Sequence, residues 1–118
     1  MYLEGLKDLP LQLPADTVKE GDIHAYHLFS PLLDSNQVKI SRDQLLDALI
    51  KENIGVGIHY NALHASKYYS QHYGIKTNLC PVAYEIGQRT FSLPLSPALN
   101  ETQVKLVVEA VQSILNYS

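Results

Sequence analysis

One short segment constrains the fold of this chain more than any other: residues 54–60 alternate large apolar side chains with glycine and histidine. Successive side chains of a strand point to opposite faces, so the alternation predicts a strand that buries one face. Glycine weakens a strand and commonly marks the close approach of a ligand or of another backbone. The pattern therefore predicts that His59 is the exposed residue beside a cleared surface and that Tyr60 lies partly in the core.

Two capping patterns predict helices on either side of this strand. Ser41 with Gln44, and Asn100 with Gln103, have the spacing of a capping box, in which each side chain bonds the backbone amide of the other residue. Apolar residues then recur at helical spacing, at Leu45, Leu46, Leu49 and Ile50 after the first box and at Val104, Val107, Val108, Val111 and Ile114 or Leu115 after the second. These patterns predict one helix from residue 41 to about residue 52 and another that begins at residue 100.

The remaining apolar segments complete a mixed fold. Residues 23–33, with apolar side chains on both faces, and residues 90–95 predict two more strands. Short helices are predicted near residues 66–72 and 81–87, with Gly87 as the stop of the second. The order of elements predicts an α/β (α+β) two-layer sandwich, in which a small, mainly antiparallel, three-stranded sheet packs against helices. A length of 118 residues allows one modest core, so residues 1–118 are expected to form a single domain.

The first fifteen residues have a different character. Residues 1–6 resemble the end of a helix, and Pro10 and Pro14 favour extended backbone after it because proline lacks an amide donor. A domain that begins at the end of a helix suggests that a preceding part is missing. Residues 1–15 are therefore expected to be the end of an interdomain connection.

Charge and composition exclude several classes of function. The net charge of −3 and the scattered lysines and arginines argue against a nucleic-acid partner. No apolar stretch reaches the roughly 20 residues that span a bilayer, so no membrane partner is expected, and residues 1–10 lack the pattern of a signal peptide. A single cysteine makes no internal disulfide, which favours a cytoplasmic protein.

The histidines and the single cysteine do not form a metal motif. His24 and His27 lie three residues apart, which on a strand directs them to opposite faces, and the spacing of His59 and His64 fixes no geometry without a helix. Cys80 alone does not complete a zinc set and is expected to be buried. No metal site is therefore predicted.

Five segments in order resemble the nucleotide-sugar aminotransferases of the DegT family. They are residues 24–29 (HAYHLF), 41–45 (SRDQL), 55–64 (GVGIHYNALH), 89–95 (RTFSLPL) and 100–104 (NETQV). Their order and spacing agree with the family over nearly the whole chain. The chain is accordingly identified as similar to the C-terminal small domain of a fold-type I aminotransferase.

The resemblance implies an enzyme that uses pyridoxal phosphate (PLP) and works as a homodimer. Such an enzyme moves an amino group, usually from glutamate, to a keto sugar linked to a nucleotide. The resemblance also implies that the lysine that binds PLP lies in an N-terminal large domain, which is missing here. None of the seven lysines of this chain stands in the family's lysine setting, so no catalytic residue is nominated and PLP is not expected to be held by this chain alone.

What the resemblance assigns to this domain is one wall of the active-site cleft. By position, His59 and Tyr60 match the histidine and tyrosine that line the cleft in the family, and His64 is a further candidate. Arg89 is expected to form a structural ion pair at a helix end. Two alternatives remain open: a stand-alone module that binds a nucleotide sugar or a full-length aminotransferase, and a small hydrolase that uses Cys80 or His59.

Overall fold

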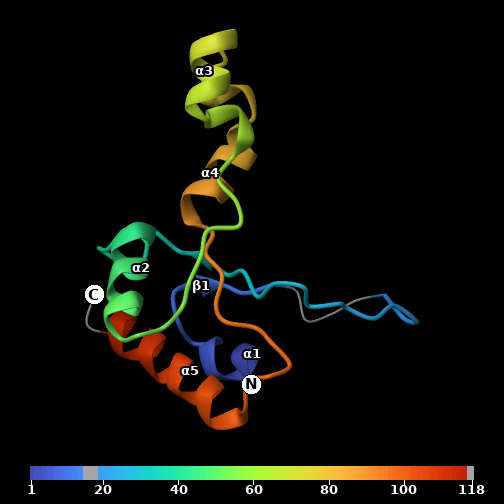
Figure 1. The fold of residues 1–118 in the computed structure, drawn as a ribbon, viewed down its shortest axis with the longest axis vertical. Helices are drawn as coiled ribbons and strands as arrows, with labels where there is room; N and C mark the ends of the chain where they lie inside the picture. The colour runs from blue at the N-terminus through green and yellow to red at the C-terminus, as the bar shows by residue number, and fades with distance from the viewer. Residues whose placement is uncertain (15–18, 117–118) are drawn as a thin grey trace.

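The computed structural model describes residues 1–14 and 19–116, which form a helical body with two projections (Figure 1). The elements, in chain order, are α1 (Tyr2–Leu6), β1 (Leu11–Gln12), β2 (Leu32–Leu33), α2 (Arg42–Lys51), η1 (Leu63–Ala65), α3 (Lys67–Tyr73), η2 (Thr77–Leu79), α4 (Pro81–Arg89) and α5 (Glu101–Asn116). α1, α2 and α5 lie together in the body, whereas α3 stands far from it at the end of an arm that α4 joins to the body. The four predicted helices are thus confirmed.

The predicted three-stranded sheet is wrong in its strand count. Among the described residues there is one two-stranded antiparallel sheet, in which Leu11 pairs with Leu33 and Gln12 with Leu32. The segments predicted as strands at residues 54–60 and 90–95 form no strand. Isolated antiparallel bridges link Gly57 with Ser92, Thr90 with Leu32 of β2, and Leu93 with Phe29. Pro94 lies within the segment at residues 90–95 and Pro31 precedes β2, and a proline has no amide to donate to a ladder. The mixed fold and the antiparallel sense are confirmed.

The predicted strand over residues 23–33 is also wrong in its first half. Ile23 is 94% exposed, and residues 23–28 belong to neither strand of the sheet. Tyr26 takes a left-handed φ of 43°, its amide donates to His24 Nδ1 at 2.9 Å, and the two rings lie 4.0 Å apart. His24 and Tyr26 therefore contact each other, and the apolar pattern joins the core only from Phe29 onward.

Both capping boxes form as predicted. The amide of Gln44 donates to Ser41 Oγ at 3.2 Å and the Ser41 amide donates back to Gln44 Oε1 at 2.8 Å. The amides of Asn100 and Gln103 exchange the equivalent bonds at 2.9 Å each. The predicted stripe of α5 faces the core, with Val107, Val111 and Leu115 buried. The core consists of Tyr2, Leu6, Phe29, Leu33, Leu45, Leu46, Leu49, Phe91, Leu93, Val107, Val111 and Leu115.

The N-terminal helix α1 is part of this core. A Cβ at Gly5 would lie 2.7 Å from Val108 Cγ1, so the absence of a side chain lets α1 approach α5 closely. The side-chain amide Nε2 of Gln112 donates to the Gly5 carbonyl at 2.8 Å. Residues 2–6 are therefore helical, and Gly5 is bonded to the C-terminal helix. Their role as part of an interdomain connection stays a prediction.

Tyr2 makes the stability of the body sensitive to alkaline pH. Its hydroxyl donates to the Pro94 carbonyl at 2.7 Å, and burial raises the pKa of Tyr2 from 10.0 to about 12. Because the folded chain favours the neutral phenol, the stabilisation is complete below pH 10.0 and is lost as the pH rises towards about 12. We expect the free energy of unfolding, measured with urea, to fall over this interval.

A Tyr2→Phe variant is the matched control for this pH dependence. It loses the bond to Pro94, which costs about 1 kcal/mol at neutral pH, but it has no phenol to titrate at this position. We expect its stability to decline less than that of the wild type between pH 10.0 and about 12. An equal decline in both proteins would show that Tyr2 is not the group responsible.

The arm, residues 60–86, has no core of its own. None of its residues is buried. Seven of its large apolar or aromatic side chains are exposed: Tyr60, Leu63, Tyr68, Tyr73, Leu79, Val82 and Ile86. The radius of gyration of the chain is 15.7 Å, against roughly 13.5 Å for a compact domain of this length. The arm therefore gains little from packing within this chain.

Candidate functional site

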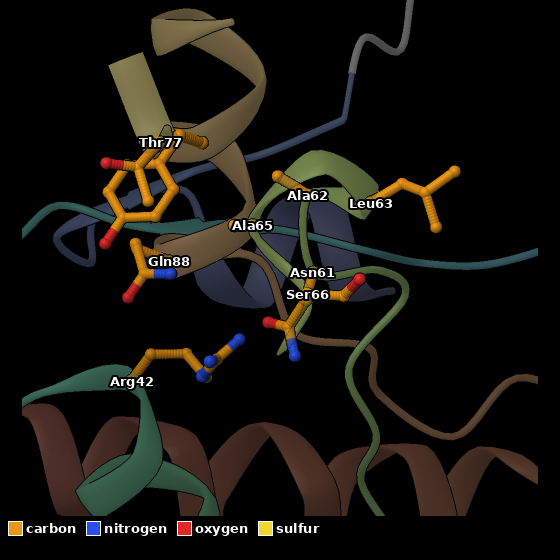
Figure 2. A pocket seen from close by; sticks show the side chains of 9 residues that line it. Arg42, Asn61, Ala62, Leu63, Ala65, Ser66, Thr77 and Gln88 are labelled. Carbon is orange, nitrogen blue, oxygen red and sulfur yellow. The ribbon is translucent and has the colours of Figure 1, made fainter. Parts of the chain in front are cut away.

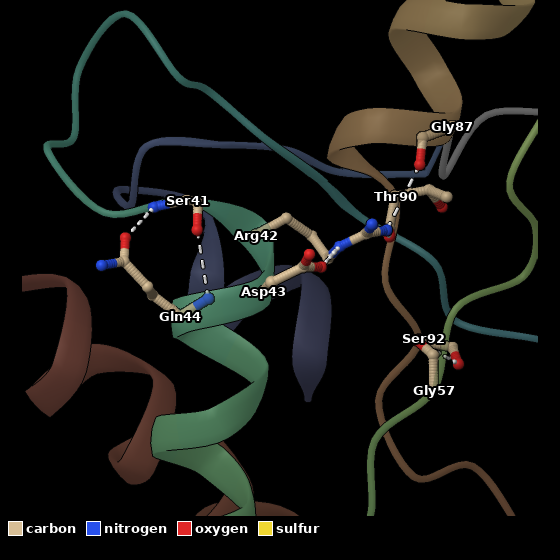
Figure 3. A network of polar contacts seen from close by, with 8 residues as sticks. All are labelled: Ser41, Arg42, Asp43, Gln44, Gly57, Gly87, Thr90 and Ser92. Carbon is tan, nitrogen blue, oxygen red and sulfur yellow. Dashed lines mark hydrogen bonds and ion pairs between the residues drawn. The ribbon is translucent and has the colours of Figure 1, made fainter.

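His59 lies just beyond the point where two chain segments pair. Gly57 and Ser92 exchange backbone bonds, from the Ser92 amide to the Gly57 carbonyl at 2.8 Å and from the Gly57 amide to the Ser92 carbonyl at 3.3 Å. Figure 3 shows the two residues facing each other. The half-buried imidazole of His59 places Nδ1 2.7 Å from Ser92 Oγ. The bridge thus brings a serine hydroxyl under the histidine.

The two glycines before His59 have different surroundings. A Cβ at Gly57 would lie 2.9 Å from His59 Cε1 and 3.3 Å from Ser92 Oγ, whereas a Cβ at Gly55 would meet nothing within 4 Å. The space cleared at Gly57 is therefore occupied by the imidazole of His59 itself. The sequence predicted the approach of a ligand or of another backbone at the glycines, whereas the atoms nearest Gly57 belong to the side chains of His59 and Ser92.

The predicted exposures of the His59 and Tyr60 side chains are wrong. Tyr60 is 72% exposed, and His59 is the half-buried member of the pair. The bridge ends at Gly57, so the alternation of a strand does not continue to these two residues. Their rings remain in contact, edge to face, with centroids 4.8 Å apart. The structure thus brings His59 and Tyr60 together, with the tyrosine outermost.

His64 belongs to a different set of contacts. It lies in η1, where Nε2 is 3.0 Å from the Thr77 carbonyl and the ring is 6.4 Å from that of Tyr84. A carbonyl only accepts, so His64 Nε2 must carry the hydrogen. The contacts found for His64 hold the base of the arm together, and none of them involves His59 or Tyr60.

The sequence did not identify the cavity that lies between the body and the arm. It has a volume of about 430 Å³ and is lined by Arg42, Asn61, Ala62, Leu63, Ala65, Ser66, Thr77, Tyr84 and Gln88 (Figure 2). Arg42 enters from α2, whereas the other lining residues come from the arm and its base. The Arg42 side chain extends from α2 towards Asn61.

Arg42 joins α2 to α4 from a buried position. Its side chain is 7% exposed, and Nη1 donates to the carbonyls of Thr90 at 2.9 Å and Gly87 at 3.2 Å (Figure 3). Nε pairs with Asp43 Oδ1 at 2.5 Å, and the Asp43 side chain is 75% exposed. An arginine in the first turn of a capped helix gave no signal of burial in the sequence, because charged residues are common there.

The prediction that Gly87 ends its helix is wrong, because α4 continues to Arg89. Gly87 is buried, and a Cβ there would lie 2.7 Å from the Ala62 amide nitrogen. The residue therefore lets the segment after His59 cross α4 at contact distance. Arg89 forms the expected helix-end ion pair, with Glu85 at 2.8 Å, and also donates to the Leu33 carbonyl at 2.7 Å.

Cys80 is exposed, contrary to the prediction that it is buried. It stands at the N-terminus of α4, in the arm that has no buried residue. Within residues 1–14 and 19–116, no three His, Cys, Asp or Glu side chains come together as a possible metal site. No helix in this part of the chain is long and apolar enough to cross a membrane.

The lysines do not fit the task of holding PLP. All seven are exposed, and none lines the cavity beside Arg42. Lys7 is paired with Glu4 at 2.6 Å, and this ion pair raises the pKa of its amine. A lysine that forms a Schiff base is activated by desolvation or by a neighbouring cation, and these positions supply neither.

The comparisons with known proteins identify the class to which this arrangement belongs. A family model for the DegT/DnrJ/EryC1/StrS aminotransferases matches residues 1–112, and the chain belongs to that family. It is 34% identical, over 100 residues, to an uncharacterised protein of Methanocaldococcus jannaschii. This match covers 85% of the chain and 26% of that protein. The similarity to the DegT family found in the sequence is thereby confirmed.

Two solved structures share the fold. DesV of S. venezuelae is 28% identical with a TM-score of 0.80, and the match covers 97% of this chain and 29% of DesV. A DegT DnrJ EryC1 StrS aminotransferase from Brucella abortus is 27% identical with a TM-score of 0.73, and the match covers 97% of this chain and 28% of that protein. The chain thus spans less than a third of the length of these relatives.

Proposed function

We propose that this chain acts as the C-terminal small domain of a PLP-dependent aminotransferase that transfers an amino group from glutamate to a nucleotide-linked keto sugar. Its part is to form one wall of the active-site cleft, with His59 and Tyr60 on that wall. The PLP-binding lysine comes from a large domain outside this sequence. The observation that carries the proposal is the family match over residues 1–112. In addition, the chain aligns with only 28% of the larger Brucella abortus aminotransferase.

The surface of the chain supports a partner domain. The accessible surface is 8175 Å², whereas a compact monomer of 13.2 kDa exposes about 6,400 Å². The surplus of about 1,800 Å² is roughly twice what one partner buries in a standard protein interface. The exposed apolar side chains of the arm account for part of it, and we propose that the arm packs against the large domain or the second subunit of the dimer.

The contacts around His59 favour a cleft wall over a separate hydrolase. Ser92, whose hydroxyl lies against His59, is only 5% exposed and is therefore screened from a substrate. Cys80 is exposed, but none of the contacts found for His59 involves it. Tyr60 instead offers a large exposed ring beside the imidazole, as expected of a surface that contacts a ligand.

A domain exchange tests the proposal. Residues 1–112 would replace the matching part of the Brucella abortus aminotransferase, and the chimera would be assayed for PLP binding and for the conversion of glutamate to 2-oxoglutarate. We expect the chimera to convert glutamate, and we expect the same chimera with His59→Ala and Tyr60→Ala to bind PLP but to be slower by about 10-fold or more. A folded chimera with bound PLP that converts glutamate no faster than the host lacking its small domain would contradict the proposal.

A further inference from the structure

We propose that the cavity between the body and the arm is a binding site for the phosphate group of a small ligand, with Arg42 as its principal donor. The cavity has a volume of about 430 Å³, and the Arg42 side chain extends from α2 towards Asn61 within it (Figure 2). The inference does not involve His59 or Tyr60, so its test is independent of the proposed function.

Arg42 has two hydrogen-bond donors that the fold does not use. A guanidinium carries five N–H donors. Nε pairs with Asp43, and Nη1 donates to the carbonyls of Gly87 and Thr90. The two remaining donors are both on Nη2, which has no hydrogen bond to the described residues. Nη2 is not one of the buried atoms that lack a partner in this part of the chain, so it is accessible to solvent or to a ligand.

The charge of Arg42 is only partly compensated. Its side chain is 7% exposed, whereas Asp43, its ionic partner among the described residues, is 75% exposed. A buried charge is costly unless it is closely paired, and water screens an exposed carboxylate. No described Asp, Glu, Lys or His lines the cavity, so Arg42 makes its potential positive. An anion that enters the cavity therefore completes the pairing of the guanidinium.

The neutral polar side chains of the cavity favour a phosphate group over a smaller anion. Asn61, Ser66, Thr77 and Gln88 line it with amide and hydroxyl groups, and none of these side chains has a hydrogen bond to another described residue. Together with Nη2 of Arg42 they offer donors from several directions. A phosphate group presents three strong acceptor oxygens, whereas a carboxylate presents two.

The size of the cavity allows for the part of the ligand that carries the phosphate. Small-molecule sites commonly have volumes of roughly 300–1,000 Å³, and this cavity lies within that range. Ala62, Leu63 and Ala65 add apolar surface to its lining. The ligand class is therefore a small organic phosphate.

Titration of the chain with inorganic phosphate, at an ionic strength held constant with sodium chloride, tests the site directly. Backbone amide NMR locates the bound anion by the signals that shift. We expect saturable shifts at residues 61–66 and at Gln88, with a Kd of about 1–10 mM because so small a ligand makes few contacts. Shifts confined to the surroundings of exposed lysines, or shifts that do not saturate at several times that concentration, would overturn the proposal.

Gln88→Ala tests the lining of the cavity with little risk to the fold, because the Gln88 side chain is exposed. We expect it to weaken phosphate binding about 5-fold, the usual effect of one lost hydrogen bond. Gln71→Ala is the matched control, since Gln71 is an exposed glutamine of α3 that does not line the cavity. If both variants bound phosphate as tightly as the wild type, the placement of the anion in this cavity would be wrong.

Arg42→Met and acetate test the donor and the class of anion. A folded Arg42→Met chain should lose saturable phosphate binding, and unchanged binding would overturn the role of Arg42. If that variant does not fold, the comparison of the Gln88 and Gln71 variants decides. Acetate should bind more weakly than phosphate, and equal affinity would overturn the choice of a phosphate group. No arm of this experiment needs PLP or glutamate, so the domain exchange judges the proposed function separately.

Discussion

Replacing Arg42 by methionine is expected to lower the free energy of unfolding by about 3 kcal/mol, because it leaves buried carbonyls without a donor. Arg42 Nη1 bonds the carbonyls of Gly87 and Thr90, which come from the end of α4 and the residue after it. Methionine keeps the length of the side chain but donates nothing. Urea unfolding followed by circular dichroism measures the change.

Asp43→Asn is the matched control for Arg42. It removes the charge that pairs with Arg42 Nε, but the Asp43 side chain is 75% exposed, and such pairs contribute about 1 kcal/mol or less. We expect the Asp43 variant to lose at most a third of the stability lost by the Arg42 variant. Equal losses would show that the ion pair, and not the bonds to the two carbonyls, accounts for the contribution of Arg42.

Replacing Gly87 by alanine is expected to cost about 2 kcal/mol, since inserting even one methyl into a well-packed contact forces the backbone to shift. The new Cβ would lie 2.7 Å from the amide nitrogen of Ala62 and 3.3 Å from the carbonyl carbon of Asn61. Both are backbone atoms and cannot rotate away. We therefore expect the segment after His59 to separate from α4, with faster hydrogen exchange at residues 61–66.

Gly55→Ala is the matched control for Gly87. A Cβ at Gly55 meets nothing within 4 Å, and its φ is not in the left-handed range. The substitution should be neutral or should stabilise the chain by about 0.5 kcal/mol, because alanine restricts the unfolded state. If the two alanine variants were equally stable, the contact between Gly87 and Ala62 would not constrain the arm.

Local patterns in the sequence predicted the helices well because helix ends depend on neighbouring residues. Ser41 with Gln44, and Asn100 with Gln103, satisfy each other's amides without help from distant parts of the chain. Strands depend on distant partners, and here most of the pairing is limited to isolated bridges. The pairing of Leu11 with Leu33 was missed because the two residues are distant in the sequence and nothing near either one specifies the other.

The candidate site remains a prediction, and its expected geometry was wrong. The motif at residues 55–64 pointed to His59, Tyr60 and His64, and the structure keeps the first two in contact. Their exposures were reversed because strand alternation was extended past the last paired residue, Gly57. Arg42 was missed because its burial depends on the carbonyls of Gly87 and Thr90, which lie more than forty positions away in the sequence.

We propose that this chain contributes one domain to an aminotransferase and does not hold PLP by itself. The most direct test is to incubate the isolated chain with PLP, reduce with borohydride and locate the labelled lysines by mass spectrometry. Because all seven lysines are exposed and none lines the cavity beside Arg42, we expect only weak labelling spread over several of them. Stoichiometric labelling of one lysine, abolished when that lysine is replaced by alanine, would contradict the claim.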